Sequence, residues 1–581
     1  MLKQVQHDGR TLSVVVCFAL VGCTTIPRAP SGPVEVQILG INDFHGNLEP
    51  PKNAIDVIRA DGSVAKVPAG GVAYLAGAAK ALRQGHKRSV TVSAGDMIGA
   101  SPLVSALFVD EPAIAAMNLV GVDYNAVGNH EFDKGSAELM RMQSGGCARH
   151  TTRTPCKVEP FAGASFKFLA ANVVTANGAT LFPGTALKDF GDVQIGLIGM
   201  TLKETATLVT PAGVAGLTFA DEAATANAAV PALKAAGADA IVLLIHQGAS
   251  TKGGYNEKTC PGLDGDIIPI LDKLDPAIDV VVSGHTHAAY ICERARPGGG
   301  APIMLTSAGR YGTLITDLRL TIDSGDRRTS RGVVAKRANN IIVQGEGFGE
   351  TVLSDAAPRF AADPATKALV ERYVAAAQPE AARVVGRLSG TATRKSDEDR
   401  EISAGNLIAD AQLAAGQSAG AQIAFINSGG VRTDLTPGAG GTVTFGDIFA
   451  MQPFGNNLVV KSLTGTQLKA LLEQQFSSGR NSAERPNLLL PSRGFNFSYD
   501  LSRPAEQRIV RASLYGKPID PAARYRIVVN NFLASGGDNF NVLASGTDAV
   551  DAGSDVDALE AHLRGGASVP ATDRVRDVTP G

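Results

Sequence analysis

Residues 34–47 read VEVQILGINDFHGN, an apolar run that passes directly into polar residues and a glycine. The run at 36–41 predicts a buried β-strand, because near-continuous Val, Ile and Leu are typical of strands covered on both faces. Asp43 and His45 follow the end of that strand. Alternate residues of an extended chain point the same way, so the two side chains can bind one metal ion. Taken alone, however, an Asp-x-His pair is more often a hydrogen-bonded loop than a ligand pair.

Four more predicted strands end in polar loops of the same kind. These loops are 95–96 after strand 89–93, 128–133 after 124–127, 246–247 after 240–245, and 284–287 after 280–283. Five of the nine His residues lie in the five loops. Ligands gather at the carboxyl ends of strands in an open α/β sheet, so we expect one shared site. Mixed His, Asp and Asn ligands suit Zn, Mn, Fe or Co better than Ca or Mg.

The chain of 581 residues is too long for a single core, and its pattern indicates two α/β domains. Strands at 168–170, 193–198 and 303–307, with helices at 71–82 and 223–236, complete the first domain, which we place at 34–345. A helix at 363–377 lies within a predicted helical connector, 346–384. A smaller α/β domain, 385–565, follows with strands at 422–426, 458–460 and 525–529. Residues 566–581 are expected to form a loose tail.

The composition is that of a globular protein, with 44% hydrophobic and 19% charged residues. Basic and acidic residues nearly balance, giving a net charge of -2. Proteins that bind nucleic-acid polymers or membrane surfaces generally need a basic excess, so the charge argues against both classes.

The first residues indicate export. The apolar run at 12–22 is far shorter than the ~20 residues that a membrane span requires. Residues 1–22 resemble a bacterial lipoprotein signal, in which Cys23 becomes the acylated first residue and 23–33 a tether. The expected location is therefore the periplasm or outer membrane of a Gram-negative bacterium, with the lipid as the only membrane contact. The alternative is an ordinary cleaved signal with an incidental Cys.

Four of the six Cys residues lie beyond the leader: Cys147, Cys156, Cys260 and Cys292. An even number in an oxidising compartment favours disulfides, and three connectivities are possible. We prefer Cys147–Cys156, which brackets a short polar insert, and Cys260–Cys292. A Cys-based zinc site is the alternative, but the sequence holds no C-x-x-C pair.

The five loops resemble, in order and spacing, those of the calcineurin-like metallophosphoesterases. The blocks NDFHGN at 42–47 and GNHEFD at 128–133 resemble the 5'-nucleotidase/UDP-sugar hydrolase branch. The resemblance implies a four-layer α/β/β/α catalytic domain and two divalent metal ions. It assigns one metal to Asp43, His45 and His287, the other to Asn129, His246 and His285, and a bridging role to Asp96.

The chemistry of such a site follows from its charge. Two cations ~3.5–4 Å apart can bind a hydroxide and polarise the phosphoryl oxygens of an in-line displacement. His130 and Asp133 lie three residues apart, so Asp133 can orient the imidazole. The resemblance implies that this dyad stabilises the transition state and protonates the leaving oxygen. The alternative is that His130 only caps a helix.

Polar and aromatic clusters in the second domain suggest a nucleoside pocket. Phe454 and Phe532 each lie in a loop rich in Gly and Asn, where two rings could stack on a base. Asn427 and Arg432 follow the strand at 422–426, and Arg432 could hold a phosphate. Asp538 could accept hydrogen bonds from ribose. From the residues alone, Phe side chains that anchor loops to the core are the favoured interpretation; the resemblance to the nucleotidase C-terminal domain reverses it.

One segment departs from the family pattern. Its phosphate-binding Arg residues precede a segment that resembles 405–411, but here residues 397–399 are three consecutive acids. Arg400 is the first candidate for a substrate contact and Arg394 the second. Both could instead balance the acidic run on a solvated loop.

The sequence therefore predicts a metal-dependent phosphohydrolase acting on nucleoside 5'-monophosphates, with UDP-sugars and 2',3'-cyclic nucleotides as further candidate substrates. Two alternatives are a thiosulfohydrolase-like member of the same superfamily and a surface lipoprotein that binds nucleotides without turnover. The two Phe loops argue against the first, and the complete set of metal ligands argues against the second.

Overall fold

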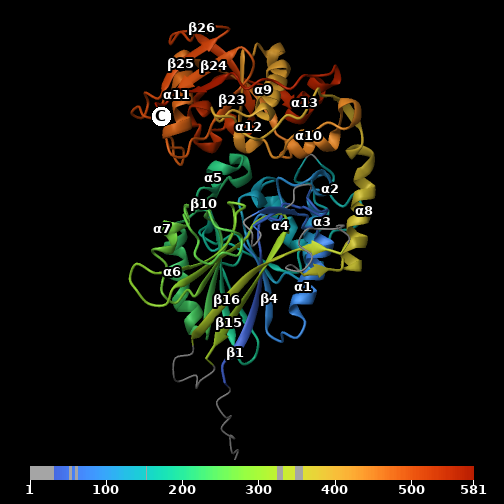
Figure 1. Cartoon of the computed structure of the whole chain (residues 1–581), viewed down its shortest axis with the longest axis vertical. Coiled ribbons are helices and arrows are strands. Elements are labelled where there is room, and N and C mark those ends of the chain that lie inside the picture. The colour runs from blue at the N-terminus through green and yellow to red at the C-terminus, as the bar shows by residue number, and fades with distance from the viewer. Residues whose placement is uncertain are drawn as a thin grey trace, which may run out of the picture.

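The computed structural model describes residues 32–51, 55–58, 63–151, 153–323, 332–346 and 358–580. Two α/β domains lie one above the other in Figure 1, and a long helix runs along one side. The expected leader, Cys23 and most of the tether lie outside the described residues, as does 347–357 of the expected connector. Within the described segments, no helix has the length and apolar character needed to cross a membrane.

Two six-stranded sheets form the centre of the first domain. In spatial order, the first sheet contains β16 (Val333–Ile342), β15 (Leu314–Ile322), β1 (Val34–Ile41), β4 (Ser89–Ser93), β5 (Tyr124–Ala126) and β6 (Lys167–Leu169). The second contains β13 (Ala289–Arg294), β14 (Ile303–Ala308), β12 (Val280–Ser283), β11 (Ala240–His246), β9 (Gln194–Thr201) and β8 (Thr185–Asp189). All eight strands predicted for this domain are present, with ends shifted by a few residues.

The side-chain alternation along β1 explains how the layers stack. Val36 and Ile38 face the second sheet, while Leu39 and Ile41 face the helices outside the first. The helices over the first sheet are α1 (Val72–Arg83), α3 (Glu111–Val120) and α4 (Ser136–Ser144). Those over the second are α6 (Glu222–Ala235) and α7 (Ile268–Leu271). The domain is thus the expected four-layer α/β/β/α arrangement.

β15 and β16 are two strands of the first sheet that the sequence did not predict. In β15, buried and partly exposed residues alternate over most of the strand, so no continuous apolar run marks it. β16 lies at the sheet edge and exposes more than half of its residues wholly or partly. Antiparallel edge strands of this kind carry a weaker sequence signal than buried parallel strands.

The second domain has a five-stranded and a four-stranded sheet. The first contains β23 (Leu489–Pro491), β20 (Ile423–Asn427), β27 (Arg524–Asn530), β22 (Asn457–Thr464) and β28 (Thr547–Ser554). The second contains β26 (Lys517–Pro518), β25 (Ile509–Leu514), β24 (Phe495–Tyr499) and β29 (Val575–Asp577). One apolar cluster gathers α9 (Ser403–Gly416), α10 (Phe445–Met451) and α13 (Asp555–Arg564). Another gathers α11 (Gly465–Ser477) and α12 (Asn531–Ala534).

The last residues belong to this domain, so the expectation of a loose tail was wrong. β29 pairs in parallel with β24. The Arg574 guanidinium lies 2.8 and 2.9 Å from the two carboxylate oxygens of Asp410, and both side chains are nearly buried. The buried ion pair between Arg574 and Asp410 holds the tail against the second domain. The polar composition of the tail does not indicate that such a pair forms.

The connector helix α8 (Pro364–Ala381) packs on the first domain and reaches the second (Figure 1). The Asp363 carboxylate accepts a hydrogen bond from the Thr366 amide and caps the helix, and Pro364 occupies its first position. Leu369, Tyr373 and Ala377 are buried in the core that also contains α1 and α3. The connector is therefore part of the first domain's packing.

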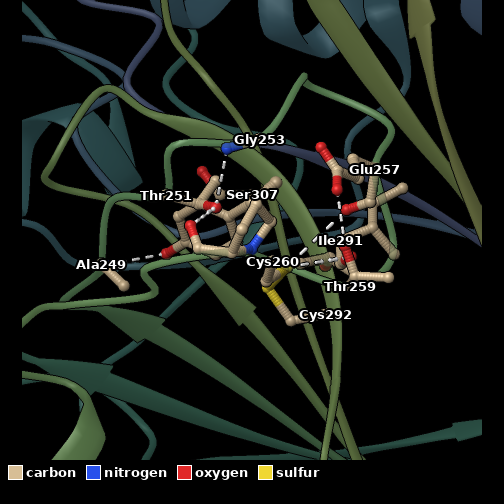
Figure 2. Close-up of a disulfide and its surroundings, with 12 residues drawn as sticks. Ala249, Thr251, Gly253, Glu257, Thr259, Cys260, Ile291, Cys292 and Ser307 are labelled. Atoms are coloured by element: carbon tan, nitrogen blue, oxygen red, sulfur yellow. Dashed lines mark hydrogen bonds between the residues drawn. A yellow bond between two sulfur atoms is a disulfide. The ribbon is translucent and has the colours of Figure 1, made fainter.

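The two disulfides join Cys147 to Cys156 and Cys260 to Cys292, as preferred from the sequence. Figure 2 shows the second bond and its surroundings. Cys260 lies in the loop after β11, and Cys292 lies in β13. This bond therefore ties the loop that follows His246 to the strand that follows His287.

Candidate metal centre and domain junction

The five predicted loops meet at one edge of the two facing sheets. β1, β4 and β5 run parallel in the first sheet, and β11 and β12 run parallel in the second. Their carboxyl ends therefore point the same way, and the loops converge across the gap between the sheets.

Asp43, His45 and His287 form one group. His45 Nε2 lies 3.1 Å from His287 Nε2, and His287 Nε2 lies 3.4 Å from Asp43 Oδ1. His45 Nδ1 donates to the Gly99 carbonyl at 2.8 Å. Because the carbonyl can only accept, the neutral His45 ring carries its lone pair on Nε2, facing His287.

Asp96, Asn129 and His246 form a second group. His246 Nε2 lies 3.0 Å from Asp96 Oδ2 and 3.1 Å from Asn129 Oδ1, while its Nδ1 donates to the Ala94 carbonyl at 2.7 Å. The His285 ring centroid is 5.3 Å from that of His246. Asp96 Oδ2 also lies 3.6 Å from His45 Nε2, so this carboxylate stands between the two groups.

This donor set fits divalent cations. Carboxylate oxygens, an amide oxygen and imidazole lone pairs face one another at distances where acceptors repel unless a positive charge lies between them. Burial opposes the charged form of His246, but the charges of Asp96, Asp43 and Glu131 together outweigh it and raise the His246 pKa to about 10. Asp43, His45 and His287 form one set that could hold an ion, and Asp43, Asp96 and His246 form another.

The backbone at these loops is unusual. Asp43, His45, Asp96, His285 and His287 have φ angles of 49°, 47°, 52°, 71° and 59°. This left-handed region is unfavourable for residues other than glycine and costs on the order of 1 to 3 kcal/mol each. The five side chains are therefore fixed in direction by turns that the surrounding structure must stabilise.

Neighbouring loops supply that stabilisation. The Asp43 amide donates to the Gly95 carbonyl at 3.0 Å, and the His45 amide donates to the Asp96 carbonyl at 2.9 Å. The His285 amide donates to both carboxylate oxygens of Asp43 at 3.0 Å. Main-chain amides from one loop thus hold the residues of the next, within a sheet and across the two sheets.

Glu131 holds the Asp96 loop, a role that the sequence analysis did not assign. Its carboxylate accepts hydrogen bonds from the amides of Asp96, Met97 and Gly128 at 2.8 to 2.9 Å. Gly128 must be glycine, because a Cβ there would lie 2.2 Å from Asp96 Oδ1. An acid in the 128–133 block was visible in the sequence, but nothing there distinguishes a ligand from an acceptor of backbone amides.

His130 and Asp133 form the expected dyad beside the metal groups. His130 Nδ1 donates to Asp133 Oδ2 at 2.8 Å, and the His130 amide donates to Asp96 Oδ1 at 2.9 Å. Burial opposes the charged imidazole, but Asp133 and then Asp96 outweigh it and raise the pKa of His130. The His130 and His45 ring centroids are 5.1 Å apart.

The second domain touches this dyad directly. The Phe454 ring stacks on His130 with centroids 5.9 Å apart and planes 20° from parallel. The Arg432 guanidinium carbon lies 5.8 Å from the Phe454 ring centroid. Arg394 Nη1 donates to the Arg432 carbonyl at 3.2 Å. Arg400 instead lies at a turn with φ of 65°, where its charge acts on Tyr499 of β24.

The other predicted substrate residues lie together in the second domain. Asn427 Nδ2 donates to Asp538 Oδ2 at 2.6 Å, and burial raises the pKa of Asp538. Phe532 is partly exposed at α12, and its ring packs against Gly537. Lys461 Nζ donates to the carbonyls of Ala534 at 3.1 Å and Leu543 at 2.7 Å. This buried ammonium, which the sequence analysis did not single out, fixes the loop that carries Phe532 and Asp538.

A small cavity of about 50 Å³ lies at the domain junction beside Asp133. Lys134, Arg153, Phe449 and Phe454 are among the residues that line it. Arg153 lies over the Phe449 ring at 5.5 Å, so the loop closed by Cys147–Cys156 contacts α10.

A second junction contact lies in the loop after β11. Arg485 Nη1 is 3.0 Å from Asp266 Oδ1, and its Nη2 is 2.6 Å from Asp264 Oδ2. Arg480 pairs with Asp266 as well. These contacts join the two domains on the side of the Cys260–Cys292 disulfide.

Comparisons with known proteins agree with this layout. Residues 36–289 match the family model for calcineurin-like phosphoesterase, and residues 384–545 match the model for the 5'-nucleotidase C-terminal domain. The probable 5'-nucleotidase of Treponema pallidum (strain Nichols) is 26% identical over 589 residues, covering 91% of each chain. The chain belongs to the 5'-nucleotidase family.

A solved member of the 5'-nucleotidase family has the same fold. The 5'-nucleotidase precursor from Thermus thermophilus is 26% identical with a TM-score of 0.74, and the match covers 94% of this chain and 100% of that chain. Endonuclease YhcR of Bacillus subtilis (strain 168) is 29% identical over 511 residues, which is 87% of this chain. The chain spans 38% of the length of YhcR.

Proposed function

We propose that this chain is a metal-dependent phosphohydrolase that releases phosphate from nucleoside 5'-monophosphates. UDP-sugars and 2',3'-cyclic nucleotides are further proposed substrates. The observation that carries the proposal is the stack of Phe454 on His130, with centroids 5.9 Å apart. A base held at this aromatic loop of the second domain would place its phosphate beside the dyad and the metal groups of the first.

The proposed ligands are Asp43, His45 and His287 for one cation, Asn129, His246 and His285 for the other, and Asp96 for both. Two divalent cations, whether Zn, Mn, Co or Fe, would supply a water-derived nucleophile near neutral pH and would offset the charge of the phosphoryl oxygens. The chain's part is to hold the donors rigidly, which the left-handed turns and the Glu131 contacts support.

His130 is the proposed proton donor to the leaving oxygen. Its Nδ1 is engaged by Asp133 at 2.8 Å, which leaves Nε2 to face the substrate. The raised pKa shifts the ring toward its protonated form, which is the form that a general acid requires.

Phosphate and nucleoside contacts are proposed for the second domain. Arg394 and Arg432 lie next to each other at the junction and would bind phosphate, while Phe454 and Phe532 would stack on the base. Asn427 and Asp538 would bind the ribose hydroxyls. Arg400 acts on Tyr499 of β24 and is the weakest member of the predicted set.

The test is phosphate release from AMP, UDP-glucose and 2',3'-cyclic AMP, with added Mn or Zn and with a chelator. We expect AMP hydrolysis that the chelator abolishes and added metal restores. Binding of AMP without phosphate release under any condition would reject the proposal and support a nucleotide-binding protein. Turnover of a sulfur ester but of no nucleotide would support the thiosulfohydrolase-like alternative.

Export and a lipid anchor at Cys23 are also proposed. The two disulfides are typical of an oxidising compartment, and the first residues resemble a lipoprotein signal. Replacing Cys23 with Ser should move the protein from the membrane fraction to the soluble exported fraction. No shift on fractionation would reject the anchor.

A further inference from the structure

The loop after β14 also lies at the metal edge, the edge of the two sheets where the five loops that carry the proposed ligands meet. No functional residue was predicted in this sixth loop from the sequence. Tyr311 in this loop has a φ of 60°, the same left-handed conformation as five of the proposed ligands. Its ring centroid is 5.7 Å from that of His287 and 6.0 Å from that of His45. The aromatic ring therefore borders the group of Asp43, His45 and His287.

This loop is fixed to the residues around Asp43. The Tyr311 amide donates to the Asp43 carbonyl at 2.8 Å. The Asn42 side chain accepts from the Ala308 amide at 2.7 Å and donates to the Gly309 carbonyl at 2.6 Å. A bulky residue in a left-handed turn is held only by such contacts, so Tyr311 and its neighbour Arg310 have a defined position.

Arg310 lies over the Tyr311 ring, with its guanidinium carbon 5.0 Å from the ring centroid. Stacking of this kind holds the planar group while leaving its N–H donors free to bind an anion. Within the described ranges, no carboxylate forms an ion pair with Arg310. The same holds for Arg394 and Arg432 of the second domain.

A series of ring contacts links Arg310 to the guanidinium groups of the second domain. Tyr311, which Arg310 covers, lies next to His45, and His45 lies next to His130. His130 stacks on Phe454, and Arg432 lies over the same Phe454 ring. Arg394 is held next to Arg432 by the hydrogen bond of 3.2 Å. Burial, then the charge of Arg432 and, more weakly, that of Arg310 lower the pKa of Arg394. Like charges without carboxylate partners repel, and an anion between them would relieve that repulsion.

We propose that Arg310 is a specificity-determining residue that binds the substrate phosphate from the catalytic domain, opposite Arg394 and Arg432. The proposal rests on the proposed function and adds a charge preference to it. A terminal phosphomonoester carries two negative charges near neutral pH, whereas a phosphodiester carries one. A third guanidinium therefore favours the monoester, because the additional charge gains more from each cation that it contacts.

The test compares the wild type with Arg310→Gln on AMP, a monoester, and bis(4-nitrophenyl) phosphate, a diester. Inhibition of diester hydrolysis by inorganic phosphate is measured in parallel. We expect the KM for AMP and the inhibition constant of phosphate each to rise about 10-fold, the range for one charged hydrogen bond. The diester kcat/KM should change by less than about 2-fold, and metal content should be unchanged.

The matched control is Arg372→Gln, because Arg372 is exposed on α8 and pairs with Glu159 at the surface. An equal loss on monoester and diester, or loss of bound metal, would overturn the role of Arg310. The proposed function is rejected by a different result, namely that the wild-type protein does not hydrolyse AMP. Phosphate inhibition of diester hydrolysis still measures the Arg310 contact in that case.

Discussion

The metal edge of the first domain and the substrate loops of the second are built in opposite ways. Asp43, His45 and His246 are 0% exposed, and main-chain hydrogen bonds between loops fix their directions. Phe454 and Phe532 are partly exposed and lie in loops at or near the junction. One region is complete within a single domain, whereas the other is completed where two domains meet.

This difference separates chemistry from selectivity. Changes to the proposed metal ligands should affect every ester alike, because the bound metals would act on the phosphorus centre that all esters share. Changes in the substrate loops should affect only substrates that carry a base. Substitutions in the two regions should therefore give different patterns across a panel of esters.

The largest effect is expected for Asp96→Ala, which removes the carboxylate between the two metal groups. We expect loss of bound metal and a fall in kcat on the order of 10³-fold or more for AMP and β-glycerophosphate alike. Metal analysis and initial rates measure both. Asp573→Ala, an exposed residue near the chain end, is the control. Full metal content with rates near wild type would contradict the assignment of Asp96.

Replacing His130 should leave the metals in place. We expect His130→Ala to lower kcat for AMP at least ~100-fold, the range for a general acid. The loss should be smaller for 4-nitrophenyl phosphate, because its leaving oxygen needs less protonation. His86→Ala, at a partly exposed ion pair with Glu35, is the control. Metal loss in His130→Ala would show that this residue is a ligand.

Substitutions in the substrate loops should affect substrates with a base and substrates without one differently. Phe454→Ala and Phe532→Ala should each raise the KM for AMP about 10-fold, since base stacking contributes ~1–3 kcal/mol. Neither should change kcat/KM for β-glycerophosphate by more than about 2-fold. Tyr515→Ala, 70% exposed at the turn between β25 and β26, is the control. Equal losses on both substrates would place the two rings in the structural core instead.

The smallest effect on activity is expected at Asp555, which adjoins the Phe454 loop through the bond from its amide to the Asn456 carbonyl. Burial raises the pKa of Asp555 to about 7, well above its unfolded value of 3.8, and its Oδ1 has no partner among the described residues. The folded state therefore holds this proton more tightly, and the carboxyl lowers stability as pH rises from about 4 to about 7.

Asp555→Asn should remove that loss. We expect its free energy of unfolding to exceed that of the wild type by about 4 kcal/mol at pH 8, since a pKa shift of about three units corresponds to that much free energy. The difference should shrink as the pH falls from 7 to 5, as measured by urea denaturation. A difference that does not vary with pH would show that the carboxyl does not titrate in this range.

The convergence of the proposed ligands could be predicted because most of them follow buried strands of β-branched and Leu residues. The carboxyl ends of parallel strands lie at one edge of a sheet. The positions of Asp43, Asp96 and His246 at the ends of such strands therefore predicted that their side chains lie close together. The directions of the proposed ligand side chains depend on the left-handed turns. The residue types in the sequence do not predict where those turns occur.

Residues that act across the junction were harder to predict. Arg400 was preferred to Arg394 because it is closer in sequence to residue 405, but the turn at Arg400 places its charge near Tyr499 of β24. Arg310 follows a correctly predicted strand, yet an Arg-Tyr pair in a glycine-rich turn resembles an ordinary surface loop. Their roles depend on how the domains dock, which local pattern does not encode.

Both disulfide loops of the first domain end in a contact with the second. One places Arg153 over Phe449, and the other, held by Cys260–Cys292, carries Asp264 and Asp266 toward Arg485. A cross-link restricts a loop before any partner arrives, so the ordering entropy is lost when the bond forms and not when the domains meet. Formation of the two disulfides thus orders both loops before the domains associate. The junction then forms between surfaces whose conformation is already fixed.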